Sequence, residues 1–489
     1  LPISSLPSQY GIGCFSKEAY EFVDQLALAN QKYWQILPLG PTSYGDSPYQ
    51  SFSTYAGNPY FIDLNTLIEE GVLTKKECNL ADFGSDSRFI DYGKLYKARY
   101  KLLRKAYERS NISQNPEFQT FQEENAWWLD DYSLFMAVKG FFQDECWDKW
   151  PEDIKKRYGY ALDYYREQLY FEVEFQKYMQ FEFSIQWKKL KTYANENGIR
   201  IIGDIPIYVA YDSADTWAHP ELFQLDEENV PLAVAGCPPD GFAADGQLWG
   251  NPLYRWDYHR QTGYAWWMQR LSYAFYLYDV VRIDHFRGFD EYFSIPYGDT
   301  TARNGHWEKG PGIELFHRMK EVLGERDVIA EDLGYVTDSV RQMVFESGFP
   351  GMKVFEFAFD SRDTGCAGDY LPHNYPVNSV VYTGTHDNAT LIGWYQDIPK
   401  EGREMLRNYI HDYTTSDRSL HWSVICRVMG SPARICMIPM QDYLGLDNTC
   451  RINTPSTLGT NWKWRLLDGE FTSDLQNKIK KLVRIYQRN

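Results

Sequence analysis

The sequence predicts an α/β protein, specifically a (β/α)8 barrel with a mainly helical insertion, a cleft-covering loop insertion and no C-terminal β-domain. Three observations predict this fold: short apolar runs lie far enough apart for helices between them, acidic residues follow most of the runs, and the chain has 489 residues. Parallel strands need long connections, usually helical, which such spacing provides. A barrel enzyme with insertions commonly reaches this length.

The apolar runs define eight candidate strands. They cover residues 33–37, 60–62, 200–203, 280–283, 328–330, 353–357, 380–383 and 434–438. Each run is rich in Val, Ile, Tyr or Phe, which favour strands, and is bounded by polar or turn-forming residues. Eight runs of this kind fit a closed barrel.

Six acidic residues lie at or just after the ends of these runs: Asp63, Asp204, Asp284, Glu331, Asp387 and Asp442. The carboxyl ends of barrel strands converge on one face, where barrel enzymes place their active sites. Six acids on one rim would repel one another unless several are hydrogen-bonded or used in chemistry. We expect structural roles for two or three of them and chemical roles for the rest.

The remaining chain is divided by its composition. We expect the first two strands of the barrel in 1–63, a mainly helical insertion in 64–190, and the rest of the barrel in 191–465. Residues 211–256 are rich in Pro, Gly and Trp, which favours a loop that covers a cleft. Residues 474–487 have the pattern of an amphipathic helix, so 466–489 predicts a C-terminal helix packed on the barrel.

Charge and composition exclude several classes of function. The net charge of -17 opposes binding to nucleic acid or to an anionic membrane. There is no apolar run of about 18 residues that would predict a membrane span. The cysteines are scattered without metal-ligand spacing, which favours reduced thiols in a cytoplasmic protein with no metal and no cofactor. Aromatic residues make up 17% of the chain, and such rings suit the faces of sugars.

A first chemical motif is the run Val281 to Gly288, which contains Arg282 and Asp284. Residues two apart on a strand share a face, so the arginine and the aspartate point the same way. The guanidinium favours the ionised carboxylate, which is the form that a nucleophile requires. The alternative is an ion pair that only closes the barrel; the other acids nearby favour catalysis.

Two further motifs supply carboxyl groups from later strands. In Ala330-Glu331-Asp332, side chains alternate across the strand, so at most one of the two acids faces the substrate. The longer reach of glutamate makes Glu331 the expected proton donor and Asp332 the structural acid. In Thr385-His386-Asp387-Asn388, a carboxylate beside a histidine is suited to bind two neighbouring sugar hydroxyls. A lone histidine is more often structural, but its place beside an acid at a strand end favours hydroxyl binding.

These motifs, in this order, resemble the signatures of the α-amylase clan. Other segments resemble the amylomaltase family of 4-alpha-glucanotransferases more than amylases, and the likeness extends from Leu1 to about Trp464. They are Ile3-Ser4-Ser5-Leu6-Pro7-Ser8, Tyr10-Gly11-Ile12-Gly13, Ser47-Pro48-Tyr49-Gln50, the run Gly203 to Val209, the run Gly241 to Pro252, and Gly310-Pro311-Gly312.

The resemblance implies roles for particular residues. It implies that Asp284 is the nucleophile, Glu331 the acid/base and Asp387 the transition-state stabiliser. It also implies that six residues contact sugar: Tyr49, Asp204, Trp249, Arg282, His386 and Asn453. The segment from Gly241 to Trp249 would match the family's loop over the cleft.

The implied function is a retaining transfer between α-1,4-glucans. The expected partners are maltooligosaccharides and α-1,4-glucans as donors and glucose or a maltooligosaccharide as acceptor, with no metal and no cofactor. Retention predicts carboxyl groups of Asp284 and Glu331 about 5–5.5 Å apart. Two alternatives remain: a retaining α-1,4-glucan hydrolase of amylase type, and a non-catalytic glycan-binding protein.

Overall fold

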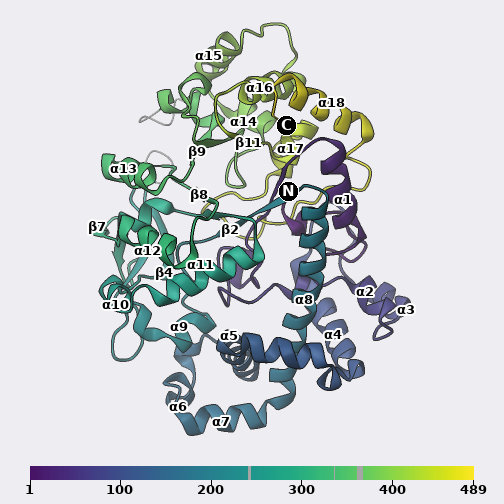
Figure 1. The fold of residues 1–489 in the computed structure, drawn as a ribbon, viewed down its shortest axis with the longest axis vertical. Helices are drawn as coiled ribbons and strands as arrows, with labels where there is room; N and C mark the ends of the chain where they lie inside the picture. Colours follow the sequence, from purple (N-terminus) through teal and green to yellow (C-terminus); the bar gives the residue numbers. More distant parts are fainter. Residues whose placement is uncertain (240–243, 335, 361–366, 489) are drawn as a thin grey trace.

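A parallel sheet of seven strands forms the centre of this computed structural model, which describes residues 1–239, 244–334, 336–360 and 367–488 (Figure 1). All neighbouring strands are parallel. The order across the sheet is β1 (Tyr33–Gln35), β2 (Arg200–Ile205), β5 (Val280–Ile283), β8 (Val328–Ala330), β9 (Gly351–Val354), β10 (Ser379–Tyr382) and β11 (Ile435–Met437).

The sheet curls into a nearly closed barrel. One apolar cluster contains side chains from all seven strands, among them Tyr33 of β1 and Met437 of β11. The Tyr382 hydroxyl of β10 also donates a hydrogen bond to Gln35 Oε1 of β1, at 3.0 Å. Strands at opposite ends of the sheet order therefore meet around one interior, and the predicted α/β barrel class is confirmed.

The candidate strand at 60–62 is wrong. These residues overlap η3, a 3-10 helix over Pro59–Phe61. Pro59 has no backbone N–H to donate to a sheet, and the Asn58 side chain accepts a hydrogen bond from the N–H of Tyr60 at 3.0 Å. The run is apolar because Tyr60, Phe61 and Ile62 are buried in the main core, not because it pairs with a strand.

Helices occupy the chain between η3 and β2 and gather at one end of the molecule (Figure 1). The two longest helices here, α5 (Pro116–Phe141) and α8 (Tyr170–Glu196), pack against each other. Helix α8 continues six residues past the predicted boundary at 190, and it also packs on α1 (Lys17–Leu28) beside the barrel. The α-helices here are α2 (Leu64–Glu69), α3 (Lys75–Leu80), α4 (Tyr92–Ser110), α5 (Pro116–Phe141), α6 (Glu152–Lys155), α7 (Gly159–Gln168) and α8 (Tyr170–Glu196).

A second, antiparallel sheet lies beside the barrel, and the sequence did not predict it. Its order is β4 (Gln247–Pro252), β3 (Ala233–Cys237), β6 (Glu291–Pro296) and β7 (His306–Lys309). The expectation that 211–256 is loop-like is therefore wrong in part, because β3, β4 and the short helix α9 (Ala214–Ala218) lie in it. Strand β3 pairs with β6, which follows the third barrel strand, β5, and local patterns do not indicate such a long-range partner.

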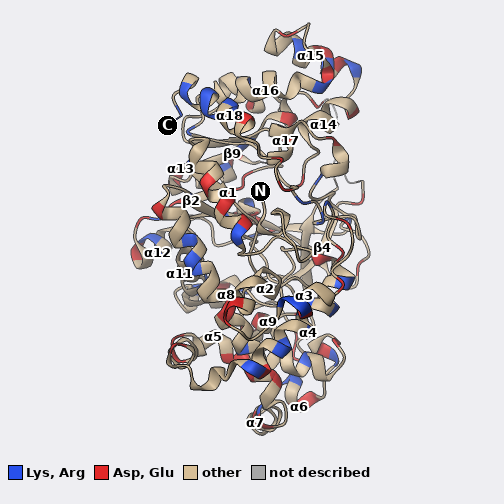
Figure 2. Ribbon diagram, turned by 90° about the vertical axis from the view of Figure 1, so that its right-hand side faces the viewer, with Lys and Arg blue, Asp and Glu red and all other residues tan. Residues whose placement is uncertain are grey.

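Helices cover the outside of the barrel, and the ribbon in Figure 2 marks positions of Lys, Arg, Asp and Glu along them. The C-terminal helix α18 (Ser473–Ile485) packs on α1 and on α16 (Leu420–Met429). Within the described residues, no helix combines the length and apolarity needed to cross a membrane. The other barrel helices are α10 (Trp256–Gln261), α11 (Ala265–Leu277), α12 (Ile313–Leu323), α13 (Asp338–Ser347), α14 (Leu391–Asp397), α15 (Lys400–Ile410) and α17 (Met440–Leu444).

Candidate active site

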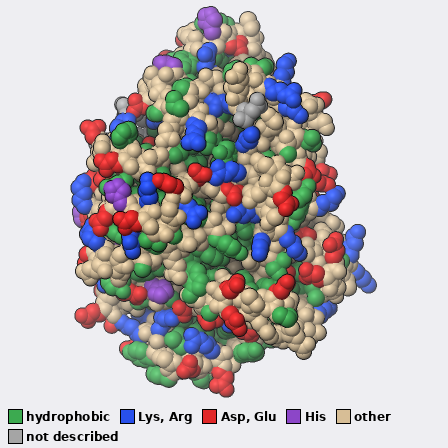
Figure 3. Space-filling view, viewed as in Figure 1, with side chains coloured by type: hydrophobic (Ala, Val, Ile, Leu, Met, Phe, Trp, Pro, Cys, Tyr) green, Lys and Arg blue, Asp and Glu red, His purple; other side chains and the backbone are tan. Residues whose placement is uncertain are grey.

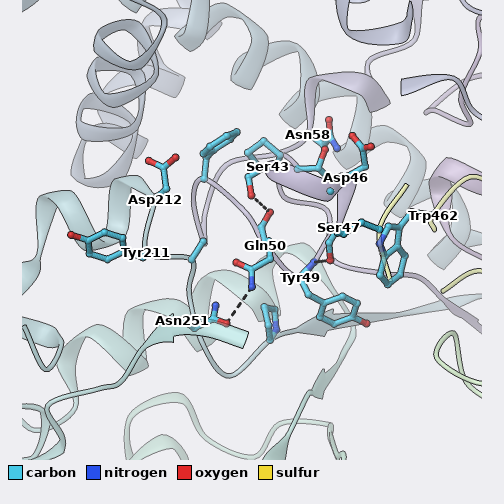
Figure 4. A pocket seen from close by; sticks show the side chains of 18 of the residues that line it. Ser43, Asp46, Ser47, Tyr49, Gln50, Asn58, Tyr211, Asp212, Asn251 and Trp462 are labelled. Atoms are coloured by element: carbon cyan, nitrogen blue, oxygen red, sulfur yellow. Dashed lines mark hydrogen bonds between the residues drawn. The ribbon is translucent and has the colours of Figure 1, made fainter. Parts of the chain in front are cut away.

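A cleft of about 2090 Å³ lies between the carboxyl ends of the strands and the helical insertion. Asp284 and Asp387 line it from the barrel, Trp249 from β4, and Tyr49 from the segment after β1. Figure 4 shows one wall, where the Gln50 amide donates to Asn251 Oδ1 at 3.2 Å and so links that segment to the second sheet. Figure 3 shows acidic and basic side chains interspersed on one face of the molecule.

Arg282 joins two of the predicted acids. It lies beside Asp204 in the pairing of β5 with β2, and its Nη1 is 2.7 Å from Asp204 Oδ2 and 2.9 Å from Asp284 Oδ1. The Tyr49 hydroxyl donates a further hydrogen bond to Asp204 Oδ2 at 2.7 Å. The side chains of Asp204 and Arg282 are 0% and 4% exposed, whereas that of Asp284 is 29% exposed and reaches the cleft.

The environment of Asp284 acts on its charge in two directions. Burial raises the pKa of this carboxyl to about 6, the Arg282 guanidinium opposes the rise, and the Asp204 carboxylate adds to it. The sequence pattern indicated only the arginine, which lowers the pKa, because the larger effect of burial depends on the fold. Asp284 is still mainly ionised at neutral pH, as a nucleophile must be.

Glu331 follows β8 and is fixed by backbone donors. Its Oε2 accepts from the N–H of His285 at 2.7 Å and its Oε1 from the N–H of Leu333 at 2.9 Å. Burial first, and then the negative charge of Asp284, raise the pKa of Glu331 to about 8. Asp332 is held elsewhere, because its Oδ1 accepts from the N–H of Met352 in β9 at 2.7 Å. Glu331 thus stands next to Asp284 in the protonated form at neutral pH.

The backbone at His285 connects these two acids. Its φ of 52° lies in the left-handed region, which is uncommon for a residue other than glycine. The N–H of this residue, directly after Asp284, donates to Glu331. A strained residue of this kind persists only when its surroundings support it, and such residues cluster at functional sites. The sequence analysis assigned no role to His285.

Asp387 lies in the turn after β10 and is the most exposed of the three predicted catalytic acids, at 49%. Its Oδ1 accepts from Asn453 Nδ2 at 2.7 Å and lies 3.4 Å from His386 Nε2. Asn453, predicted as a sugar contact, therefore binds Asp387 in this structure. The charges of Asp387 and His386 both act on the pKa of Asp284, so the turn lies beside the other acids.

Aromatic side chains surround the acids. Tyr49 and His386 are stacked with ring centroids 5.1 Å apart, and Trp462 lies 5.9 Å from each of them. Figure 4 shows Tyr49 and Trp462 near each other at one side of the cleft. Trp249 meets His285 edge to face at 4.9 Å. Trp462 was missed because no local pattern distinguishes it from the other tryptophans. Of the segment from Gly241 to Trp249, residues 241–243 lie outside the described part of the chain.

Two of the six acids have structural partners. Asp63 caps α2 by accepting from the N–H groups of Asn65 and Thr66. Asp442 accepts from the Thr383 hydroxyl and from the N–H of Leu391, the latter at 2.8 Å. Asp204, Asp284, Glu331 and Asp387 are brought together: the charges of Asp204 and Asp387 act on the pKa of Asp284, and the charge of Asp284 acts on that of Glu331.

The barrel and the site define an enzyme of glycosidic-bond chemistry: an ionised carboxylate and a neutral glutamic acid stand side by side at the strand ends of a β/α barrel, with a third acid near them. The model of the 4-alpha-glucanotransferase family matches residues 1–470. This chain belongs to that family, as the sequence resemblance predicted.

Proteins similar to this one match it over nearly its whole length. It is 50% identical to a 4-alpha-glucanotransferase of Clostridium butyricum over 99% of both proteins. It is 45% identical to a 4-alpha-glucanotransferase of Thermus thermophilus over 99% of this chain and 97% of the relative. An amylomaltase from Streptococcus agalactiae, solved in complex with acarbose, has a TM-score of 0.96 at 40% identity and is matched over 100% of this chain and 98% of its own.

Proposed function

We propose that this protein is a 4-alpha-glucanotransferase that moves α-1,4-glucan segments from a donor maltooligosaccharide to the 4-hydroxyl of an acceptor sugar. Family membership supports the reaction. The observation that supports the mechanism is the neighbouring pair of acids, in which the pKa of Glu331 lies above that of Asp284. One carboxyl is charged while the other still holds a proton, as a retaining mechanism requires.

In the first half of the proposed reaction, the Asp284 carboxylate attacks the anomeric carbon of the donor. The bond from that carbon to the leaving oxygen breaks, and Glu331 transfers its proton to this oxygen. A β-glycosyl ester on Asp284 results. Loss of the proton leaves Glu331 ionised, and its oxygens remain hydrogen-bonded to the N–H groups of His285 and Leu333.

In the second half, Glu331 acts as a base. It removes the proton from the acceptor's 4-hydroxyl, the acceptor oxygen attacks the same anomeric carbon, and the ester bond to Asp284 breaks. Two inversions restore the α-linkage. Glucose or a maltooligosaccharide would serve as acceptor, and both acids return to their starting protonation states.

The remaining residues divide into contacts and supports. We assign Asp387 and His386 to the sugar hydroxyls, and Tyr49 and Trp249 to the walls of the cleft, because these side chains line it. Asp204 and Arg282 were predicted to contact sugar, but their side chains are almost fully buried. We propose instead that Asp204 and Arg282 hold Asp284 in position. Asn453 would support Asp387 and contact sugar from the rim.

Products from maltotriose test this function against a hydrolase. We expect glucose together with a ladder of maltooligosaccharides longer than maltotriose, detected by chromatography, because an acceptor sugar reaches the ester before water does. Products that are only shorter than the substrate would favour the amylase-type hydrolase.

The variant Asp284→Asn tests both enzyme functions against the non-catalytic glycan-binding protein. We expect it to keep binding maltotriose and to lose turnover, because an amide does not attack the anomeric carbon. Turnover equal to that of the parent would contradict the assignment of the nucleophile.

A further inference from the structure

The turn that carries Asp387 is held by a second segment, residues 451–453. The N–H of Asn453 donates to the carbonyl of His386 at 3.1 Å, and its side-chain amide donates to Asp387 Oδ1 at 2.7 Å. This segment follows η12 (Asn448–Cys450), more than sixty positions along the chain from the turn. The carboxylate that would meet the sugar is therefore positioned from outside its own loop.

Arg451 completes this connection with one guanidinium. Its Nη2 donates to the backbone carbonyl of Asp387, and its Nε donates to the backbone carbonyl of Asn453 at 2.7 Å. Three bonds thus close a ring: arginine to the turn, arginine to the asparagine backbone, and asparagine side chain to the Asp387 carboxylate. The guanidinium is planar and rigid, so its two donors fix the two carbonyls relative to each other, which a lysine ammonium does less well.

A counterion role alone does not account for Arg451. The charges of Glu356, Asp387 and Asp397 act on Arg451, and Glu356 is the buried one, 2% exposed just after β9. Burial and the charge of Asp442 raise the pKa of Glu356 well above its usual range, and the charge of Arg451 opposes this rise. Within the described part of the chain, the guanidinium hydrogen bonds of Arg451 go to backbone carbonyls of the Asp387 turn and of the segment that holds it, and not to a carboxylate.

We propose that Arg451 is a positioning residue for the transfer reaction, which sets the main chain of Asp387 so that the carboxylate held by Asn453 meets the reacting sugar ring. The proposal rests on the function assigned above to Asp387. A displacement of about 1 Å at a reacting group lowers a rate by about 10²-fold. Because Asp387 would act on the transition state more than on bound substrate, this loss falls on kcat.

The test compares Arg451→Gln with Arg488→Gln. Arg488 is a matched control, because its guanidinium donates to the backbone carbonyls of Met429, Ser431 and Ala433 at 2.7, 2.8 and 2.9 Å in another part of the fold. For R451Q we expect kcat on maltotriose to fall about 10²-fold with KM within about threefold of the parent. For R488Q we expect parental kcat even where thermal stability falls.

Two further variants separate positioning from folding. R451K keeps the charge with poorer geometry, so its kcat should lie between those of the parent and R451Q. In R451A, guanidinium ion at a concentration below that which unfolds the protein should restore part of kcat, whereas it should not restore Asp387→Asn. If R451Q does not fold, R451K and the rescue of R451A decide the matter.

The outcomes distinguish this proposal from the function on which it rests. If Asp387→Asn loses activity while R451Q keeps kcat within about threefold of the parent, the positioning role is wrong and the catalytic assignment stands. If Asp387→Asn keeps parental activity, the assigned role of Asp387 fails first. A fall in R451Q that appears only in KM, or that R488Q shows equally, also overturns the positioning role.

Discussion

At the scale of single residues, the site depends on two carboxyl groups that differ in charge although they lie together. Glu331 is buried beside an existing negative charge, so it keeps its proton to about pH 8. Asp284 has the Arg282 guanidinium at 2.9 Å and ionises near pH 6. Burial raises both pKa values and Arg282 lowers both, while the negative charge of Asp284 raises the pKa of Glu331 further.

This order predicts a bell-shaped dependence of kcat/KM on pH. Activity should fall below about pH 6, where Asp284 is protonated, and above about pH 8, where Glu331 has lost its proton. The two limbs belong to the interacting pair. A rate that kept rising above pH 8 would contradict the role of Glu331 as the acid.

Asp204→Asn should shift the acidic limb of this profile to lower pH. The negative charge of Asp204 raises the pKa of Asp284, so its removal favours ionisation of the nucleophile. The profile of kcat/KM measures the shift. Asp442→Asn serves as the control, because Asp442 binds Thr383 and Leu391 and its charge does not act on Asp284 among the interactions of the described residues. A shift to higher pH in the Asp204 variant would count against this account.

At the scale of elements, the small antiparallel sheet matters because β4 carries Trp249 to the edge of the cleft. Its strands β3 and β4 approach closely at Gly236. A Cβ added to Gly236 would lie 2.1 Å from the carbonyl oxygen of Gln247. Only glycine therefore permits this pairing, and the position of Trp249 depends on it.

Gly236→Ala should destabilise the protein by about 1–3 kcal/mol, because the backbone of β4 must move to admit the methyl group. It should also raise the share of hydrolysis in the products from maltotriose, since Trp249 would cover the cleft less well. Urea unfolding and product analysis measure the two effects. Gly159→Ala is the control, because nothing lies within 4 Å of its added Cβ, and it should leave both quantities near the parent values.

At the scale of the whole molecule, the barrel brings together residues that are far apart in the sequence. The hydrogen bond from Tyr382 to Gln35 spans 347 positions and joins β10 to β1 inside the barrel. Around that interior the carboxyl ends of β2, β5, β8 and β10 present Asp204, Asp284, Glu331 and Asp387. The site exists only while the sheet remains curled.

Tyr382→Phe should lower the free energy of unfolding by about 1–2 kcal/mol, because it leaves a partly buried acceptor on Gln35 without its donor. Denaturant unfolding measures the change. In Tyr193→Phe the lost hydrogen bond to Asp24 is exposed, at 2.7 Å, so water replaces the partner and the loss should be smaller. An equal loss in the free energy of unfolding in the two variants would show that the Tyr382 bond stabilises the barrel no more than an exposed hydrogen bond does.

Much of the fold and site could be predicted because the signals are local. Buried parallel strands are apolar runs, and acids at their ends are visible in the chain, so Asp284, Glu331 and Asp387 were found together with seven of the strands. Two predictions from local patterns were wrong. The run at 60–62 overlaps a buried 3-10 helix and is not a strand, and residues 211–256 contain strands and are not only a loop. Burial and strand pairing with a distant partner decide both cases.

The sequence by itself determined the family and the barrel class, since these depend on residue types in a fixed order, and it predicted which acids carry the reaction. Only the tertiary structure decided which atoms meet. The N–H of His285 donates to Glu331, and Arg451 reaches back to the Asp387 turn across 64 positions. Such contacts arise when the chain closes on itself, because hydrogen bonds and charges act over distances in space and not along the sequence.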